Sequence, residues 1–124
     1  MIDFTNGSLF KLQPINVQDV LGDIHPLLVQ GENAVTAFRG IRDFVVFTDK
    51  RIITVNIQGM TGKKRDFTSL PYSKVQAFSV ETAGTFDLDG ELELWFSGLG
   101  KVRLEFKGNV NIQSLGQLIA QFVL

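Results

Sequence analysis

The chain contains no cysteine, and among its 124 residues it has one histidine, one tryptophan and one tyrosine. Without cysteine it can form no disulfide, and it offers no thiolate nucleophile and no cysteine-based metal site. No stretch approaches the ~18 consecutive apolar residues of a membrane-spanning helix. The first residues also lack the basic start and apolar core of a signal peptide. We therefore expect a cytoplasmic protein.

The chain also lacks an excess of charge of either sign, because its 12 lysines and arginines nearly balance its 13 aspartates and glutamates, for a formal net charge of −1. This balance predicts no bulk attraction to nucleic acid, which is not an expected partner. Membrane binding would need a local basic patch. Phenylalanine, by contrast, occurs 11 times, and its ring fills cores and dry interfaces without bringing a polar group.

The hydrophobic period of the chain changes near residue 34. Before it, residues 1–33 predict an N-terminal helical extension, with Asn16 as a candidate N-cap and Pro26 as the residue that stops the helix. After it, residues 34–107 alternate in the manner of strands separated by turns and predict a seven-stranded β-barrel. The expected strands are 34–41, 43–48, 51–58, 63–70, 74–82, 91–96 and 102–106.

The period becomes helical again at the end of the chain. Residues 111–124 predict an amphipathic helix capped by Asn111, with one apolar face. Short turns between consecutive strands favour antiparallel pairing, and a sheet of this size must curl or close. We therefore expect one domain over 1–124, mainly β with α, in which the helix caps a curled, partly open antiparallel barrel. The apolar face is formed by Ile112, Leu115, Leu118, Ile119, Phe122 and Val123.

Several runs resemble the bacterial pleckstrin-homology-like (PH-like) domain family, a group of small uncharacterised bacterial proteins. These are IRDFVVFTDKRIITVNIQGMTGKK (41–64), SLPYSKVQAFSVETAGTFDLDGELELWF (69–96) and the helix from Asn111, preceded by LLVQGENAV (27–35). The resemblance implies the PH-like plan of seven strands and a capping helix. It also implies a binding module that is not an enzyme, and a homo-oligomeric ring, five-membered for single-domain members. It does not identify a ligand, because fold does not imply function.

One strand supports assembly independently of the resemblance. Phe44, Val45, Val46 and Phe47 are apolar on both faces of the strand, whereas a strand of a small barrel normally keeps one face polar. Either the N-terminal segment covers the outer face within one chain, or a second copy does. On the second alternative these four residues, with Phe78, form a candidate oligomer interface.

Two further sets of residues are candidates for binding. Tyr72, Glu81 and Trp95 lie in the resembling core and are candidate groove residues for an unidentified protein or peptide. Lys50, Arg51, Lys63, Lys64 and Arg65 are candidate anion-binding residues of a peripheral membrane protein that binds anionic lipid head groups. The plainer interpretation makes Asp49–Arg51 the polar tip of a hairpin and Lys63–Arg65 a solvated strand edge.

No motif predicts catalysis, a metal or a cofactor. There is no nucleophile elbow, HExxH motif or glycine-rich phosphate loop, and His25 stands alone. Asp87, Asp89 and Glu91 alternate like calcium ligands, but the twelve-residue calcium-loop pattern is missing. We therefore expect no catalytic residue, no metal site and no cofactor.

Overall fold

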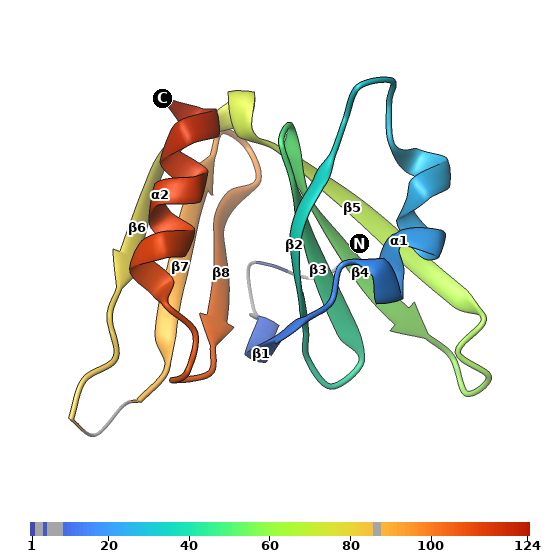
Figure 1. Ribbon diagram of the computed structural model, residues 1–124, viewed down its shortest axis with the longest axis horizontal. Helices are drawn as coiled ribbons and strands as arrows, with labels where there is room; N and C mark the ends of the chain where they lie inside the picture. The colour runs from blue at the N-terminus through green and yellow to red at the C-terminus, as the bar shows by residue number, and fades with distance from the viewer. Residues whose placement is uncertain (2–3, 5–8, 86–87) are drawn as a thin grey trace.

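The computed structural model describes residues 1, 4, 9–85 and 88–124, which form one mixed sheet with two α-helices (Figure 1). The helices are α1 (Gln18–Ile24) and α2 (Ile112–Val123), and two 3-10 turns cover His25–Leu27 and Tyr72–Lys74. The sheet order is β5-β4-β3-β2-β1-β8-β7-β6. The strands are β1 (Leu9–Ile15), β2 (Ala34–Arg39), β3 (Asp43–Thr48), β4 (Arg51–Gln58), β5 (Lys64–Pro71), β6 (Val75–Glu81), β7 (Gly90–Phe96) and β8 (Gly100–Phe106).

The predicted fold class is confirmed, but the strand count and the pairing need a correction. The described chain has eight strands rather than seven, and β1 pairs parallel with β8, so the sheet is not wholly antiparallel. The added strand lies inside the segment 1–33 that was predicted to be helical. This strand does not show the regular alternation of apolar and polar residues that marks the other strands. Lys11 has a φ of 52°, the register shifts between Leu9 and Leu12, and Pro14 interrupts the run.

Two half-sheets diverge from β1 and enclose the main core on their inner faces (Figure 1). Helix α2 packs there against β6 and β7 and places Leu115 and Ile119 in the core. The predicted cap is confirmed, since the Asn111 side chain accepts a hydrogen bond of 3.1 Å from the backbone N–H of Ser114. Near the C-terminus the ring of Phe122 stacks on Tyr72, with 5.4 Å between the ring centroids.

A second, smaller core lies on the other side of the sheet, under α1. Val20 and Ile24 of α1 pack with the outer-facing side chains of Phe44, Val46 and Ile53, and all five are buried. Asn16 assists the start of this helix by accepting a 3.0 Å hydrogen bond from the backbone N–H of Gln18. Strand β3 is therefore apolar on both faces because it has a core on each side.

Among the residues that the structure describes, no helix has both the length and the apolar character needed to cross a bilayer.

Candidate functional site

The candidate oligomer interface is mostly interior to one chain. Phe44 is 1 % exposed, and Val45, Val46 and Phe47 are fully buried. Of the two alternatives that the sequence left open, the structure shows the first: helix α1 of the N-terminal segment covers the outer face of this strand. These four side chains therefore present no surface to a second copy. Phe78 is half-buried and packs against the main core from β6. Any contact between copies must therefore use residues other than Phe44, Val45, Val46 and Phe47.

The candidate anion-binding residues are not brought together either. Lys50 and Arg51 lie at the turn that opens β4, whereas Lys64 pairs with Gln58 at its other end. Gln58 is seven positions beyond Arg51, roughly 23 Å at the usual strand rise. The five cations therefore form two groups at opposite ends of the molecule rather than one patch.

Arg51 is not the solvated turn residue that the hairpin interpretation predicts. Its Nε and Nη2 donate to the carboxylate of Glu32 at 2.9 and 3.0 Å, and Nη2 also donates to the carbonyl of Leu27 at 2.6 Å. Thr48 Oγ1 donates to the same carboxylate at 2.7 Å. The Glu32 side chain is 1 % exposed and that of Arg51 is 19 % exposed, so this ion pair fastens the loop before β2 to the β3–β4 turn.

The ionisation of Glu32 follows from this arrangement. Burial by itself raises the pKa of its carboxyl group, but hydrogen bonds from Arg51, Thr48 and the backbone N–H of Val29 outweigh the burial. The net pKa of Glu32 lies below its ordinary value. The carboxylate is therefore charged at neutral pH and acts as a structural anchor.

The basic run at the start of β5 is more accessible. Lys63 and Lys64 are exposed, and neither forms an ion pair with another residue in the described part of the chain. Arg65 pairs with Asp23 of α1 at 3.2 Å. Asp66 is neutralised by the amino terminus of Met1 at 2.8 Å, a contact that lowers the pKa of the aspartate. The start of β5 therefore carries a net positive charge.

The three candidate groove residues do not line one groove. Tyr72 is 2 % exposed, and its hydroxyl donates to the backbone carbonyl of Thr48 at 2.8 Å in the main core. Trp95 and Glu81 lie on the outer face of the β6–β8 half-sheet, where Trp95 pairs with Ala77. Tyr72 is therefore a core residue, and only the other two share a surface.

That outer face carries a row of carboxylates that the sequence pattern did not identify. Glu81 pairs with Glu91, and Glu91 pairs in turn with Glu105, so three carboxylates lie side by side across three strands. Arg103 donates to both Glu91 and Glu105. These glutamates come from different strands, so only the cross-strand register reveals that they are neighbours.

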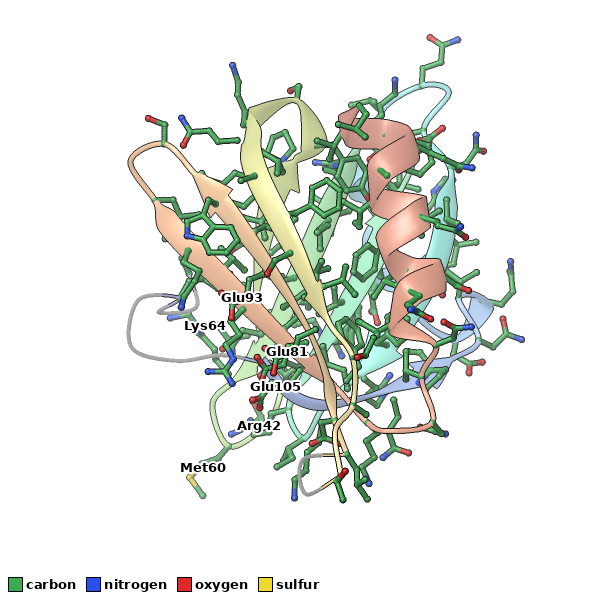
Figure 2. The ribbon with its side chains drawn as sticks, turned by 90° about the vertical axis from the view of Figure 1, so that its left-hand side faces the viewer. Arg42, Met60, Lys64, Glu81, Glu93 and Glu105 are labelled. Atoms are coloured by element: carbon green, nitrogen blue, oxygen red, sulfur yellow. The ribbon has the colours of Figure 1, made fainter. Side chains whose placement is uncertain are left out.

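The carboxylate row perturbs its own ionisation. Burial raises the pKa of Glu105, a hydrogen bond with Glu91 raises it further, and Arg103 opposes both. Together with Glu93, the face has four glutamates opposed by Lys101 and Arg103. Figure 2 labels Glu81, Glu93 and Glu105 on this side of the molecule. The outer face of β6–β8 is therefore net negative.

Two loop tips expose large apolar side chains at the lower end of the molecule. Ile41, between β2 and β3, is 92 % exposed, and Met60, between β4 and β5, is fully exposed. Arg42 Nη2 donates to the carbonyl of Gly59 at 2.7 Å and so ties the two tips together. Figure 2 shows Met60 projecting beyond Arg42 at this end.

The described residues contain no cluster of three or more histidine, cysteine or acidic side chains arranged to hold a metal ion. Asp87, one of the three alternating acidic residues, lies outside the described residues. His25 is exposed at the end of α1.

Comparisons with known proteins agree on one family. Residues 3–123 match the family model described as "Bacterial PH domain". The chain is 43 % identical over 119 residues to the uncharacterised protein YjqA of Bacillus subtilis, covering 94 % of this chain and 95 % of that protein. The resemblance inferred from the quoted runs is thus confirmed.

Solved structures give the same result. A crystal structure of a protein with a pleckstrin-homology domain from Shewanella loihica has a TM-score of 0.81 and 39 % identity, covering 95 % of this chain and all of that one. A pleckstrin-homology domain from Shewanella amazonensis has a TM-score of 0.68 and 37 % identity, covering 96 % of this chain and 93 % of that one.

Proposed function

Because the chain belongs to the bacterial PH domain family, we propose that it is a non-catalytic binding module that assembles head to tail into a closed ring of identical copies. The ring would present binding surfaces for a protein or peptide whose identity is not fixed by this chain. Five copies is the number that the sequence resemblance implies.

The observation that carries this proposal is that the sheet has two ends. Strand β5 begins the order and β6 completes it, so each pairs with a neighbour on one side only in the described chain. In Figure 1, β6 lies at the left margin and the first residues of β5 lie toward the right. Two different open edges on opposite sides suit a heterologous contact, which repeats around a ring if the rotation closes.

A non-catalytic role is supported by the surroundings of the polar groups. The buried carboxylate of Glu32 is occupied by Arg51 and Thr48, and Glu91 by Arg103. An active site needs a convergent set of titratable groups around a space that a substrate can enter. The ionised groups described here instead fasten loops and strands.

The ring is tested by measuring the mass of the purified protein in solution. Size-exclusion chromatography with light scattering, and native mass spectrometry, should give one closed stoichiometry between about 1 and 100 µM chain. A monomer throughout this range would refute the ring.

The exposed loop tips favour a second candidate function, docking to an anionic membrane. Ile41 and Met60 are apolar, and the cations nearest along the chain are Arg42, Lys63 and Lys64. Burying an apolar side chain of this size stabilises a membrane complex by up to about 2 kcal/mol, and each nearby cation adds about 1 kcal/mol. This site excludes Lys50 and Arg51, which lie at the other end of β4.

Vesicle flotation tests this second candidate. The protein should float with vesicles of phosphatidylglycerol and phosphatidylcholine at 50 mM salt and less at 150 mM salt, because screening weakens the cationic contribution. The I41S/M60S variant should lose flotation. Val29→Ser, which removes an apolar side chain that is 56 % exposed elsewhere, should not. Equal flotation of both variants would refute the loop-tip site, and absence of wild-type flotation at 50 mM salt would refute membrane docking.

A further inference from the structure

We propose that a groove between β2 and α2 binds an extended peptide segment of a partner protein. The segment adds to the first half of β2 as a short strand and places uncharged, apolar side chains over Phe38 and Leu115. The groove has a volume of about 400 Å³ and is lined by residues of β1, β2, the loop after β8 and the first half of α2. The inference rests on the proposed role as a binding module and deepens it, because it names the surface and the chemistry of the partner.

The first half of β2 has an open edge. Strand β3 pairs with β2 from Ala34 to Arg39, whereas β1 pairs with it only from Ala37 to Arg39. After Ile15 the chain leaves the sheet and enters α1 (Figure 1). In the described part of the chain, no strand therefore pairs with residues 34–36 on the side away from β3. A strand edge of this kind can accept the backbone hydrogen bonds of an added peptide.

The groove lies where the pairing of β1 with β2 stops. Pro14 of β1 and Thr36 of β2 lie on either side of the last paired position, and both line the groove. Across from them, the first half of α2 forms the other wall through Ser114, Leu115 and Leu118. Side chains alternate between the two faces of a strand. A segment added beside β2 therefore directs every second side chain into the space between β2 and α2.

The floor of the groove is apolar and preformed. Phe38 and Leu115 both line the groove, and each is 5 % exposed. The ring of Phe38 makes edge-on contacts with Phe47 and Phe106, with 5.7 and 4.9 Å between the ring centroids. These contacts hold the ring in place before a ligand arrives, which reduces the conformational entropy that binding costs.

The lining also decides the charge of the side chains that the groove accepts. None of the described residues that line it has an ionisable side chain, and its polar groups are the amides and hydroxyls of Thr36, Asn109, Asn111 and Ser114. An ionised side chain entering the groove would lose hydration without meeting an opposite charge. An apolar side chain gains from burial on Phe38. The partner segment therefore has uncharged, apolar residues at alternate positions.

The open strand edge favours a peptide over a small apolar molecule as the occupant. A small molecule would cover the floor but would leave the backbone edge of β2 unpaired, whereas an extended peptide uses both. The groove is also separate from the two ends of the sheet order, because β2 lies in the interior of that order. The groove and the proposed ring can therefore be tested independently.

Selection of phage-displayed random heptapeptides against the full-length chain tests this site. The enriched peptides should carry uncharged, apolar residues at alternate positions. Their synthetic forms, blocked at both ends and labelled with fluorescein, are then titrated by fluorescence polarisation. Ser114→Arg and Asn109→Arg each place a long cation in the groove from an exposed position, and each should weaken binding at least tenfold. Gln117→Arg, with the same charge change on the exposed side of α2 outside the groove lining, should bind within twofold of wild type.

Hydrogen exchange measured by mass spectrometry tests whether the bound peptide forms a strand. Exchange of the backbone amides of residues 34–36 should slow when the peptide binds, because the added strand protects the open edge of β2. Unchanged exchange in this segment at saturating peptide would refute the strand addition.

The outcomes separate the groove from the proposed function. Circular dichroism first confirms that each variant is folded. Peptides that bind both groove variants as tightly as wild type, or that carry charges at the alternate positions, would refute the groove while leaving a peptide-binding module. Failure to enrich any peptide above a selection without the protein would refute the groove together with peptide binding. The mass in solution tests the ring separately, so a monomer that binds the peptides in the groove would refute only the ring.

Discussion

Replacing Glu32 should destabilise the fold more than its position in a loop suggests. Its carboxylate accepts hydrogen bonds from Val29, Thr48 and Arg51, the last through two nitrogens, at 2.7 to 3.1 Å. Glu32→Ala removes these acceptors and leaves the largely buried guanidinium of Arg51 without its carboxylate. Breaking a buried pair in this way costs about 3 kcal/mol, roughly a 100-fold change in the ratio of folded to unfolded protein.

Urea unfolding followed by the fluorescence of Trp95, the single tryptophan, measures this loss. All variants are compared at one chain concentration, because self-association of the proposed kind would contribute to apparent stability. Glu32→Gln should also be less stable than wild type, because its amide keeps the shape but turns an N–H toward a donor. Asp19→Asn is the control, since Asp19 is exposed in the first turn of α1. At physiological salt it should change the free energy of unfolding by at most about 0.5 kcal/mol.

The pH dependence gives an independent check. The pKa of Glu32 is lowered in the folded state, so the stability it contributes is present above its unfolded pKa of about 4.3 and is lost as pH falls below that value. The difference between wild type and Glu32→Gln should therefore shrink between pH 6 and pH 3. A loss below about 1 kcal/mol at pH 7, with no change of this difference with pH, would refute the anchoring role of Glu32.

Two further predictions concern β8 and the glycines. The pKa of Glu105 is raised in the folded state, so its contribution to stability falls as pH rises through that pKa; the free energy of unfolding of Glu105→Gln minus that of wild type should increase from pH 4 to pH 7, and a decrease would contradict this assignment. Gly22→Ala should raise the melting temperature by a few degrees, because nothing lies within 4 Å of the added methyl group in α1. Gly108→Ala should lower the melting temperature, because its methyl group would clash with the backbone carbonyl oxygen of Leu88. Equal shifts of the two variants in thermal unfolding would contradict both predictions.

Most of the elements were predictable because their signals are local. The bounds of β3 and β4 match the expected strands, and the helix from Ile112 begins after its predicted cap at Asn111. Strand β1 was not predictable in this way. Its period is broken by the left-handed conformation of Lys11, and it is held in place by parallel pairing with β8, which lies about 90 residues later in the chain.

The candidate site residues show the same difference between local signals and contacts distant in sequence. The sequence marked Arg51, Tyr72 and the Phe44–Phe47 run as unusual, but it could not tell an exposed functional residue from a buried one. Arg51 meets Glu32, Tyr72 meets Phe122, and Phe44 meets α1 only after the chain folds. The carboxylate row and the paired loop tips also bring together residues from different strands and hairpins.

By itself the sequence determined the family, the alternation of the strands, the capped amphipathic helix and the near-neutral charge. These properties follow from neighbouring residues and from composition. The tertiary structure alone decided that β1 joins the two half-sheets, that α1 covers the outer face of β3, and that positive and negative charges gather near the opposite ends of the sheet order. These features depend on strand register and on contacts distant in sequence, and no local period of the chain encodes them.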